Sequence, residues 1–185
     1  MTEWSFDVVL NREPTDAEAD ALFEAGLDDC GVVLGGRGQP SYLSCHREAP
    51  DLVAAVLAVA AEVRTVPGLR AVRARHDDLV TLGAAAQRTN GLRTRESLRL
   101  LAGAKRGPGG FPAPVNEDGG ARLYSWTEVA TWLREVLGDA LPEVVPDLVV
   151  ADHALRLADD LARYRSVRPE TVRRYVFPEP GDVAA

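Results

Sequence analysis

The sequence predicts an α+β fold in three parts, and one observation from each part supports this. Residues 1–77 alternate strand-like and helix-like segments in the order β-α-β-β-α-β. Residues 78–138 contain short helical segments around a glycine-containing turn and a loop rich in Gly and Pro. Residues 139–185 contain a linker marked by prolines, one amphipathic helix and a tail. With 185 residues, 46% of them apolar, the chain has room for more than one core.

Four strands are expected in residues 1–77. The stretch 4–10 is short, aromatic and β-branched, which is typical of a strand. Residues 31–34 and 41–45 are expected to form a hairpin across a glycine-rich loop. Residues 69–75 alternate apolar or small residues with arginines, which is the period of a half-exposed strand.

Two helices are expected between these strands. Thr15 or Asp16 is expected to cap the first, because acidic residues follow in its first turn. The second covers 51–63, which is apolar nearly all round and indicates a buried helix. This order of elements is that of the ferredoxin-like, or split-βαβ, arrangement, with two helices on one face of a four-stranded antiparallel sheet. Many unrelated functions use that fold, so it indicates no function by itself.

The middle part begins with a short helix and a tight turn. Asp78 or Thr81 is expected to cap a helix that runs over 82–88. Gly91 is expected to take the left-handed conformation that the following turn requires. Leu92, next in the chain, is expected to return to the core.

A second and a third helix follow, separated by a long loop. Thr94 is expected to cap the second helix, 95–102. Residues 105–114 are too rich in Gly and Pro for regular structure, and 122–126 is expected to form a short strand. The third helix is expected over 128–137, capped by the threonine that precedes it.

The C-terminal part is expected to contain one helix. Residues 147–165 show the apolar spacing of an amphipathic helix, with Asp159 and Asp160 on its outer face. From Val167 the sequence is mixed and contains prolines, so no regular element is expected there, and residues after Pro178 are expected to be frayed.

Charge is distributed unevenly along the chain. The formal net charge is -7, which alone argues against a general nucleic-acid or anionic-membrane binder. Residues 1–77 and 139–185 carry the excess acid, whereas 78–138 has eight basic and six acidic side chains. Within it, 87–110 has six basic side chains against one acid, Glu96. This pattern is typical either of a solvated face or of a phosphate-facing surface.

The residues between these charges favour the second interpretation. Two short helices around a glycine turn, then a basic loop and a short strand, form a helix-turn-helix with a wing. In this arrangement the second helix enters a major groove and the wing contacts phosphates.

Three motifs stand together in this part: Phe111-Pro112-Ala113-Pro114, Arg122-Leu123-Tyr124-Ser125-Trp126 and Val129-Ala130-Thr131-Trp132-Leu133, with Lys105-Arg106-Gly107-Pro108-Gly109-Gly110 ahead of the first. With these motifs, residues 79–133 resemble the small winged helix-turn-helix domains of the MerR, excisionase and AlpA-like group, in an actinobacterial-type version. The resemblance implies that helix residues Arg95, Glu96, Ser97 and Arg99 face DNA, with Lys105, Arg106 and Arg122 on the backbone. The turn residues Arg93 and Thr94 complete the candidate DNA-binding set.

Some single residues allow a second interpretation. Trp126 and Trp132 are expected in the core rather than as base-stacking platforms. Cys30 and Cys45 lie near strands expected to be adjacent and could pair, or bind a metal with His46, but buried free thiols are the commoner case and are expected here. No metal site and no cofactor is therefore expected.

The sequence also predicts that the protein is not an enzyme. His76-Asp77-Asp78 and Asp152-His153 place carboxylates beside histidines, as a general base would, but they lie at element boundaries and are expected to be solvated caps. No G-x-S-x-G, H-E-x-x-H, Walker or Rossmann pattern occurs.

Together these observations predict a cytoplasmic, sequence-specific double-stranded DNA-binding protein that acts as a transcriptional regulator. No signal peptide and no membrane-spanning run is expected. A homodimer is expected, because one short recognition helix gives modest affinity, and residues 1–77 are expected to bind a small molecule or a protein partner. The alternative is a protein-interaction or adaptor module that keeps the helix-turn-helix fold without binding DNA.

Overall fold

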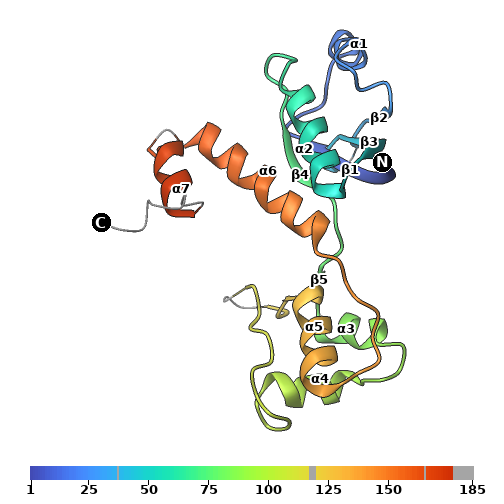
Figure 1. Cartoon of the computed structure of the whole chain (residues 1–185), viewed down its shortest axis with the longest axis vertical. Helices are drawn as coiled ribbons and strands as arrows, with labels where there is room; N and C mark the ends of the chain where they lie inside the picture. Colours follow the sequence, from blue (N-terminus) through green and yellow to red (C-terminus); the bar gives the residue numbers. More distant parts are fainter. Residues whose placement is uncertain (37, 117–119, 165, 177–185) are drawn as a thin grey trace. The chain divides into compact units, whose positions relative to one another are not determined.

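The computed structural model of the chain describes residues 1–36, 38–116, 120–164 and 166–176. Within these residues the fold is α+β, with seven helices, a four-stranded antiparallel sheet and a two-stranded sheet (Figure 1). The chain divides into two compact units. We call the first, Met1–Arg75 with the chain from Asp147 onward, the sheet unit, and the second, His76–Pro146, the helical unit.

The sheet unit contains four strands and four helices in its described residues: β1 (Thr2–Leu10), α1 (Asp16–Glu24), β2 (Cys30–Val33), β3 (Tyr42–Ala49), α2 (Leu52–Val63), β4 (Ala71–Ala74), α6 (Asp147–Arg163) and α7 (Pro169–Val176). The order through β4 is the one that the sequence predicts. The strands lie in the order β2-β3-β1-β4, and each neighbouring pair is antiparallel. The register pairs Phe6 with Cys45 and Val8 with Leu43, so these apolar side chains share one face.

Helix α6 is part of this unit although it is distant in sequence. It lies against β4 and α2, and Ala151 and Leu155 are buried in the same core as α1, α2 and the sheet (Figure 1). The sequence places Asp159 on the outer face of this helix, and that prediction is wrong. Asp159 is buried because Arg70, 89 residues away, donates from Nε to its carboxylate at 2.8 Å.

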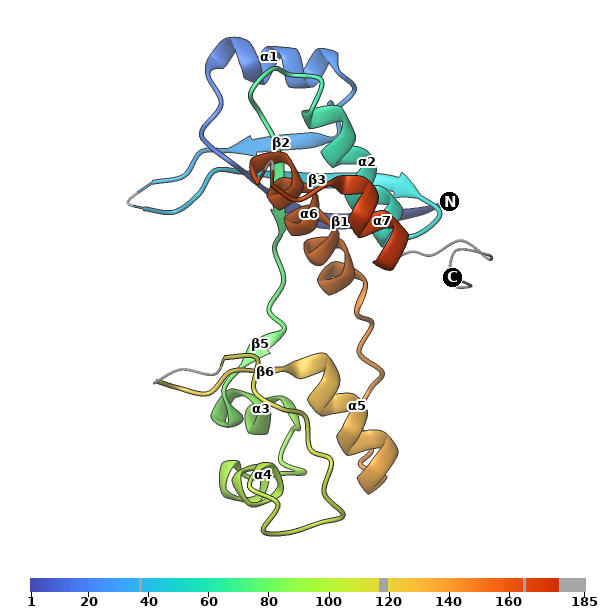
Figure 2. The same cartoon turned by 90° about the vertical axis from the view of Figure 1, so that its left-hand side faces the viewer.

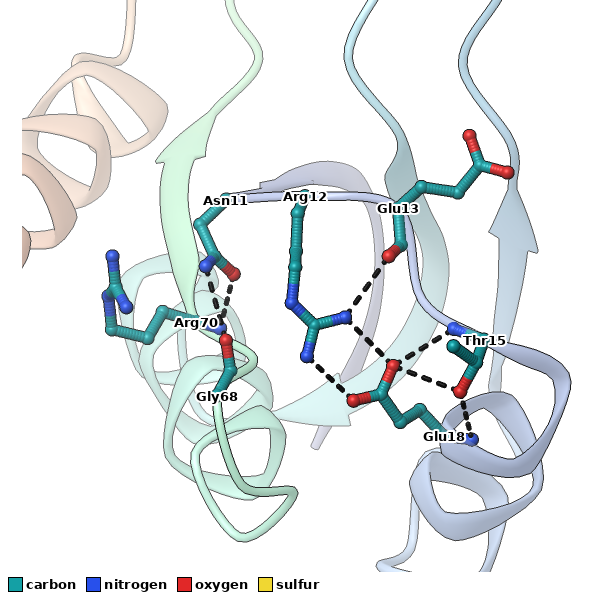
Figure 3. Close-up of polar contacts among 7 residues, drawn as sticks. All are labelled: Asn11, Arg12, Glu13, Thr15, Glu18, Gly68 and Arg70. Carbon is teal, nitrogen blue, oxygen red and sulfur yellow. Dashed lines mark hydrogen bonds and ion pairs between the residues drawn. The ribbon is translucent and has the colours of Figure 1, made fainter.

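The first helix begins with the cap that the sequence predicts. Thr15 accepts a hydrogen bond from the backbone N–H of Glu18, and the Glu18 carboxylate accepts one from the N–H of Thr15 (Figure 3). Arg12 donates two further hydrogen bonds to Glu18, at 2.8 and 2.6 Å. The bonds from Arg12, followed by that from Thr15, lower the pKa of Glu18 to about 2.

The two cysteines form a disulfide, so the expectation of free thiols is wrong. Cys30 and Cys45 are directly opposite each other on β2 and β3. Their opposed position depends on strand register, which spacing along the sequence does not determine. The bond ties the outer strand β2 to the sheet, and Cys45 lies in the core.

Beyond α6 the structure contains a helix that the sequence did not predict. Helix α7 begins at Pro169, a residue that suits the first turn of a helix because its missing N–H would be unbonded there. The expectation of frayed residues after Pro178 lies outside the described part of the chain.

The helical unit contains two short strands and three helices in its described residues: β5 (Leu79–Val80), α3 (Leu82–Arg88), α4 (Arg95–Ala102), β6 (Tyr124–Ser125) and α5 (Trp126–Leu137). β5 and β6 pair in antiparallel fashion, and Figure 2 shows them beside α3 and α5. Leu98 and Leu133 are fully buried, and Phe111 makes edge-on contacts with Tyr124 and Trp132. The expectation that Trp132 belongs to the core is confirmed.

The start of α5 differs from the prediction. The helix begins at Trp126 with Ser125 as its cap, whereas Thr127 was the expected cap. Thr127 instead donates its N–H and its hydroxyl to the Asp78 carboxylate, both at 2.7 Å. Asp78 was expected to be solvated, but it is 6% exposed. Burial opposes its ionisation, and the hydrogen bonds from Thr127 and Ser125 outweigh it and lower the pKa of Asp78.

Candidate nucleic-acid interface

The turn between α3 and α4 is shaped by three consecutive residues. Asn90 and Gly91 both have positive φ, at 50° and 87°, so the left-handed conformation predicted for Gly91 is confirmed. The fully buried Thr89 donates its hydroxyl to the carbonyl of Ala86 at 2.7 Å and accepts the N–H of Arg93 at 3.0 Å. Leu92 does not return to the core, because the turn leaves its side chain 50% exposed.

Helix α4 presents one apolar and one charged face. Thr94 caps it, as predicted, by accepting the N–H of Ser97 at 3.1 Å. Leu98 and Leu101 enter the core. Arg95 and Arg99, one turn apart, are therefore on the exposed side of the helix.

Hydrogen bonds hold the loop before β6 in place on both sides of Arg122. Asn116 donates its side-chain amide to the carbonyl of Ala121 and accepts the N–H of Leu123 at 2.7 Å. The N–H of Val115 donates to the carbonyl of Leu123 at 2.8 Å. These bonds bring the two ends of the loop together and leave Arg122 exposed between its bonded neighbours.

Arginines from these two elements meet at one groove, which we call the α4 groove. It has a volume of about 640 Å³ and is lined by Arg95 and Arg99 of α4 and by Arg122 of the loop. The remaining lining residues are small or uncharged: Thr81, Leu82, Gly83, Ala102, Gly103, Gly120, Ala121 and Tyr124. Three guanidinium groups thus line the groove, and no carboxylate is among its described lining residues.

Glu96 lies beside this groove and orients one of its arginines. Arg99 donates to Glu96 from Nε at 2.8 Å and from Nη2 at 2.6 Å. This pair, followed by the charges of Arg95 and Lys105, lowers the pKa of Glu96, so its carboxylate is ionised at neutral pH. Both side chains remain well exposed, at 56% for Arg99 and 63% for Glu96, so the pair is accessible to a ligand.

The other predicted site residues lie outside the lining of the α4 groove. Arg93 donates from Nε to Asp139 at 2.7 Å and also from Nη2, and the Asp139 side chain is only 10% exposed. Arg93 therefore joins the turn to the chain after α5. Thr94 and Ser97 form the helix cap. Lys105 and Arg106 are exposed in the loop after α4.

Sequence reasoning missed Thr81 and Gly83 as lining residues. Thr81 caps α3, and Gly83 lies where an added Cβ would come within 3.8 Å of Cδ of Arg95. Gly83 of α3 and Arg95 of α4 therefore lie side by side at the wall of the groove, within ordinary contact distance. A single glycine in a helical segment gave no signal of this, because its neighbour comes from the next helix.

Within the described ranges, no group of three or more His, Cys, Asp and Glu side chains is placed to hold a metal ion. None of the helices in the described part of the chain has the length and apolar character needed to span a bilayer.

Comparisons with protein-family models, with curated proteins and with solved structures gave no match to this chain.

Proposed function

We propose that the protein is a sequence-specific double-stranded DNA-binding protein that regulates transcription, with the α4 groove facing the DNA. The observation that carries this proposal is the meeting of Arg95 and Arg99 from α4 with Arg122 from the following loop. Arginine binds phosphate oxygens and guanine edges in a bidentate manner, so three arginines on one exposed surface suit a nucleic acid.

The local geometry supports a winged helix-turn-helix mode of binding. Helix α4 follows a tight left-handed turn and exposes its first turn, and a major groove is wide enough to admit such a helix. Arg95 and Arg99 would reach base edges or phosphates from the helix. Arg122, Lys105 and Arg106 would contact the backbone from the loops on either side of it.

The sheet unit is proposed to have the ferredoxin-like fold and to regulate the helical unit. Its strand order β2-β3-β1-β4 and its alternating helices support that fold. A homodimer is part of the proposal, because α4 has only eight residues and a single short helix reads few base pairs. We place the protein in the cytoplasm, acting without a metal or cofactor and without enzymatic activity.

One observation favours the alternative of a protein-interaction module. Arg93 is held by Asp139 and Arg99 by Glu96, so part of the positive charge is already compensated within the unit. A surface of paired charges is suited to another protein as well as to DNA.

Selection of genomic fragments by the purified full-length protein tests the proposal, because it detects binding and reports the preferred site together. We expect enrichment of a short shared sequence, and an affinity for it that falls steeply with salt in fluorescence anisotropy. Replacing Lys105 with Ala should weaken all sequences alike and reduce the salt slope by about one. Failure to retain any duplex at low salt, together with a stable complex with another protein, would favour the interaction module.

A further inference from the structure

A second arginine-lined groove lies in the sheet unit, between β4 and α6. It has a volume of about 600 Å³, and we call it the α6 groove. Its lining residues come from the β1–α1 turn, from β4 with the residue before it, and from α6: Asn11, Arg70, Val72, Arg73, Arg156, Asp159, Asp160 and Arg163. All of them belong to the sheet unit, and none belongs to the candidate DNA-binding set.

Two buried carboxylates of α6 anchor these arginines. Asp152, whose side chain is 1% exposed, lies 2.7 Å from Nε of Arg156 and 3.6 Å from Nε of Arg73. It also accepts the backbone N–H of Ala74 at 3.0 Å. Because it is buried, this aspartate holds the arginines from the protein side and cannot itself meet a ligand.

The second buried carboxylate, Asp159, also pairs with two arginines. Asp159, 10% exposed, accepts from Nε of Arg70 at 2.8 Å and lies 3.6 Å from Nη1 of Arg163. It stands seven residues after Asp152, which is about 10 Å along the helix axis. Two pairs of arginines are therefore arranged along the groove, each pair sharing one buried carboxylate.

The arginines present their outer edges to the groove. Their side chains are 35% exposed at Arg70, 51% at Arg73, 45% at Arg156 and 57% at Arg163. Three of the four contact their aspartate through Nε, and the guanidinium group of each also carries two Nη groups. Those Nη groups are the donors that bind oxyanions in a bidentate manner.

The position of Arg70 is fixed by hydrogen bonds to Asn11. The Asn11 side chain accepts the N–H of Arg70 at 2.8 Å and donates to the carbonyl of Gly68 at 3.2 Å. The N–H of Asn11 donates to the carbonyl of Arg70 at 3.0 Å. Figure 3 shows the Arg70 side chain leaving this point on the side away from Arg12. The backbone at Arg70 is thus held in place before a ligand binds, which lowers the entropic cost of binding an anion.

We infer that the α6 groove binds a small ligand with several linked phosphate groups, such as a nucleoside polyphosphate. Four guanidinium groups line it together with two carboxylates, Asp159 and Asp160, and Asp159 is already paired with Arg70 and Arg163. The volume lies in the range of small-molecule sites. Two arginine pairs about 10 Å apart favour linked anionic groups over a single ion. The surrounding residues 1–75 carry twelve acidic and seven basic side chains, which repels a long polyanion such as DNA more than a small one.

Isothermal titration of the full-length protein with sodium tripolyphosphate tests this inference, with inorganic phosphate as the comparison. We expect one saturable site for tripolyphosphate and at least tenfold weaker binding of phosphate. Arg73→Gln and Arg163→Gln should each weaken tripolyphosphate at least tenfold. Arg75→Gln is the matched control: Arg75 is as exposed as Arg73, at 51%, and pairs with Asp7 outside the groove. It should change the affinity less than twofold.

Three results would overturn the inference. The first is the absence of saturable binding by the folded wild-type protein. The second is an equal loss of affinity in Arg73→Gln and Arg75→Gln, with folding checked by circular dichroism. The third is displacement of tripolyphosphate by duplex DNA that loses affinity in the same groove variants, because the groove would then serve nucleic acid. Arg99→Ala changes the α4 groove only and should leave the tripolyphosphate site intact, so the inference does not depend on DNA binding.

Discussion

One arginine of the sheet unit and one of the helical unit use their charge in different ways. In the sheet unit, Arg47 is 12% exposed and pairs with Asp29 and Glu62 at 2.6 Å each, so its guanidinium joins β3 to its neighbours. In the helical unit, Arg99 is 56% exposed, and its partner Glu96 is as accessible as the arginine itself. Where the arginine is largely buried, as at Arg47, breaking the pair is costly to the fold. Where both partners are exposed, as at Arg99 and Glu96, the pair contributes little stability and remains open to a ligand.

The largest expected effect comes from removing Asp152, one of the two buried carboxylates of α6. Asp152→Ala leaves the N–H of Ala74 without its acceptor, while Arg73 and Arg156 stay about half exposed to water. We therefore expect unfolding of the sheet unit to become easier by about 2–3 kcal/mol. Urea denaturation measures this. Asp160→Ala, at an exposed position of the same helix, should change stability by less than about 0.5 kcal/mol. Equal effects of the two variants would contradict the role given to Asp152.

A second test concerns Asp78 of the helical unit. Its buried carboxylate accepts hydrogen bonds from the N–H and hydroxyl of Thr127 rather than from an arginine. Asp78→Asn should cost about 1.5–3 kcal/mol, because Asp78 accepts two hydrogen bonds from Thr127 in its ionised form. Asp77→Asn is the control, since the side chain of Asp77 is 92% exposed.

The same carboxylate gives the helical unit a pH dependence. The pKa of Asp78 is lower in the folded protein than its ordinary value of 3.8, so its contribution is complete above that value. It is lost as the pH falls below 3.8 toward the folded-state pKa. Thermal melts between pH 6 and pH 3 should therefore show a smaller acid loss in Asp78→Asn than in the wild type. An unchanged acid loss would show that other groups cause it.

The smallest expected effect is that of a substitution at Glu96, beside the α4 groove. Glu96→Gln removes a negative charge beside Arg95, Arg99 and Lys105, so we expect duplex affinity to rise about threefold at low salt. Glu135→Gln is matched in exposure, at 63%, and lies on α5 away from the groove. Glu135→Gln should change the logarithm of the duplex affinity by no more than half as much as Glu96→Gln. Weaker binding by Glu96→Gln would mean that Glu96 contacts the DNA or is needed to orient Arg99.

Local signals in the sequence predicted the order of elements in residues 1–75. Thr15 and Asp51 act as helix caps, and the spacing of apolar residues separates strands from helices. The turn at Gly91 and the cap at Thr94 were predictable for the same reason, since both depend on neighbours within a few residues.

Interactions between distant residues were not predictable in this way. The partner of Asp159 is 89 residues away, that of Asp78 is 49 away, and that of Arg93 is 46 away. Periodicity identifies which face of a helix is apolar, but a buried aspartate paired with a distant arginine has the same local sequence as a solvated one. The α4 groove was predictable in part, because Arg95, Arg99 and Arg122 are basic residues around a turn. Its wall at Gly83 was not.

Duplex binding by variants of the α4 groove tests the central claim most directly. We expect Arg95→Ala, Arg99→Ala and Arg122→Ala each to weaken binding of the selected duplex by about 1–3 kcal/mol in fluorescence anisotropy at fixed salt. Arg134→Ala, which removes an arginine of α5 that does not line the groove, should change affinity less than twofold. If the three groove variants remain folded and bind the duplex as tightly as the wild type, the α4 groove is not the DNA-binding surface.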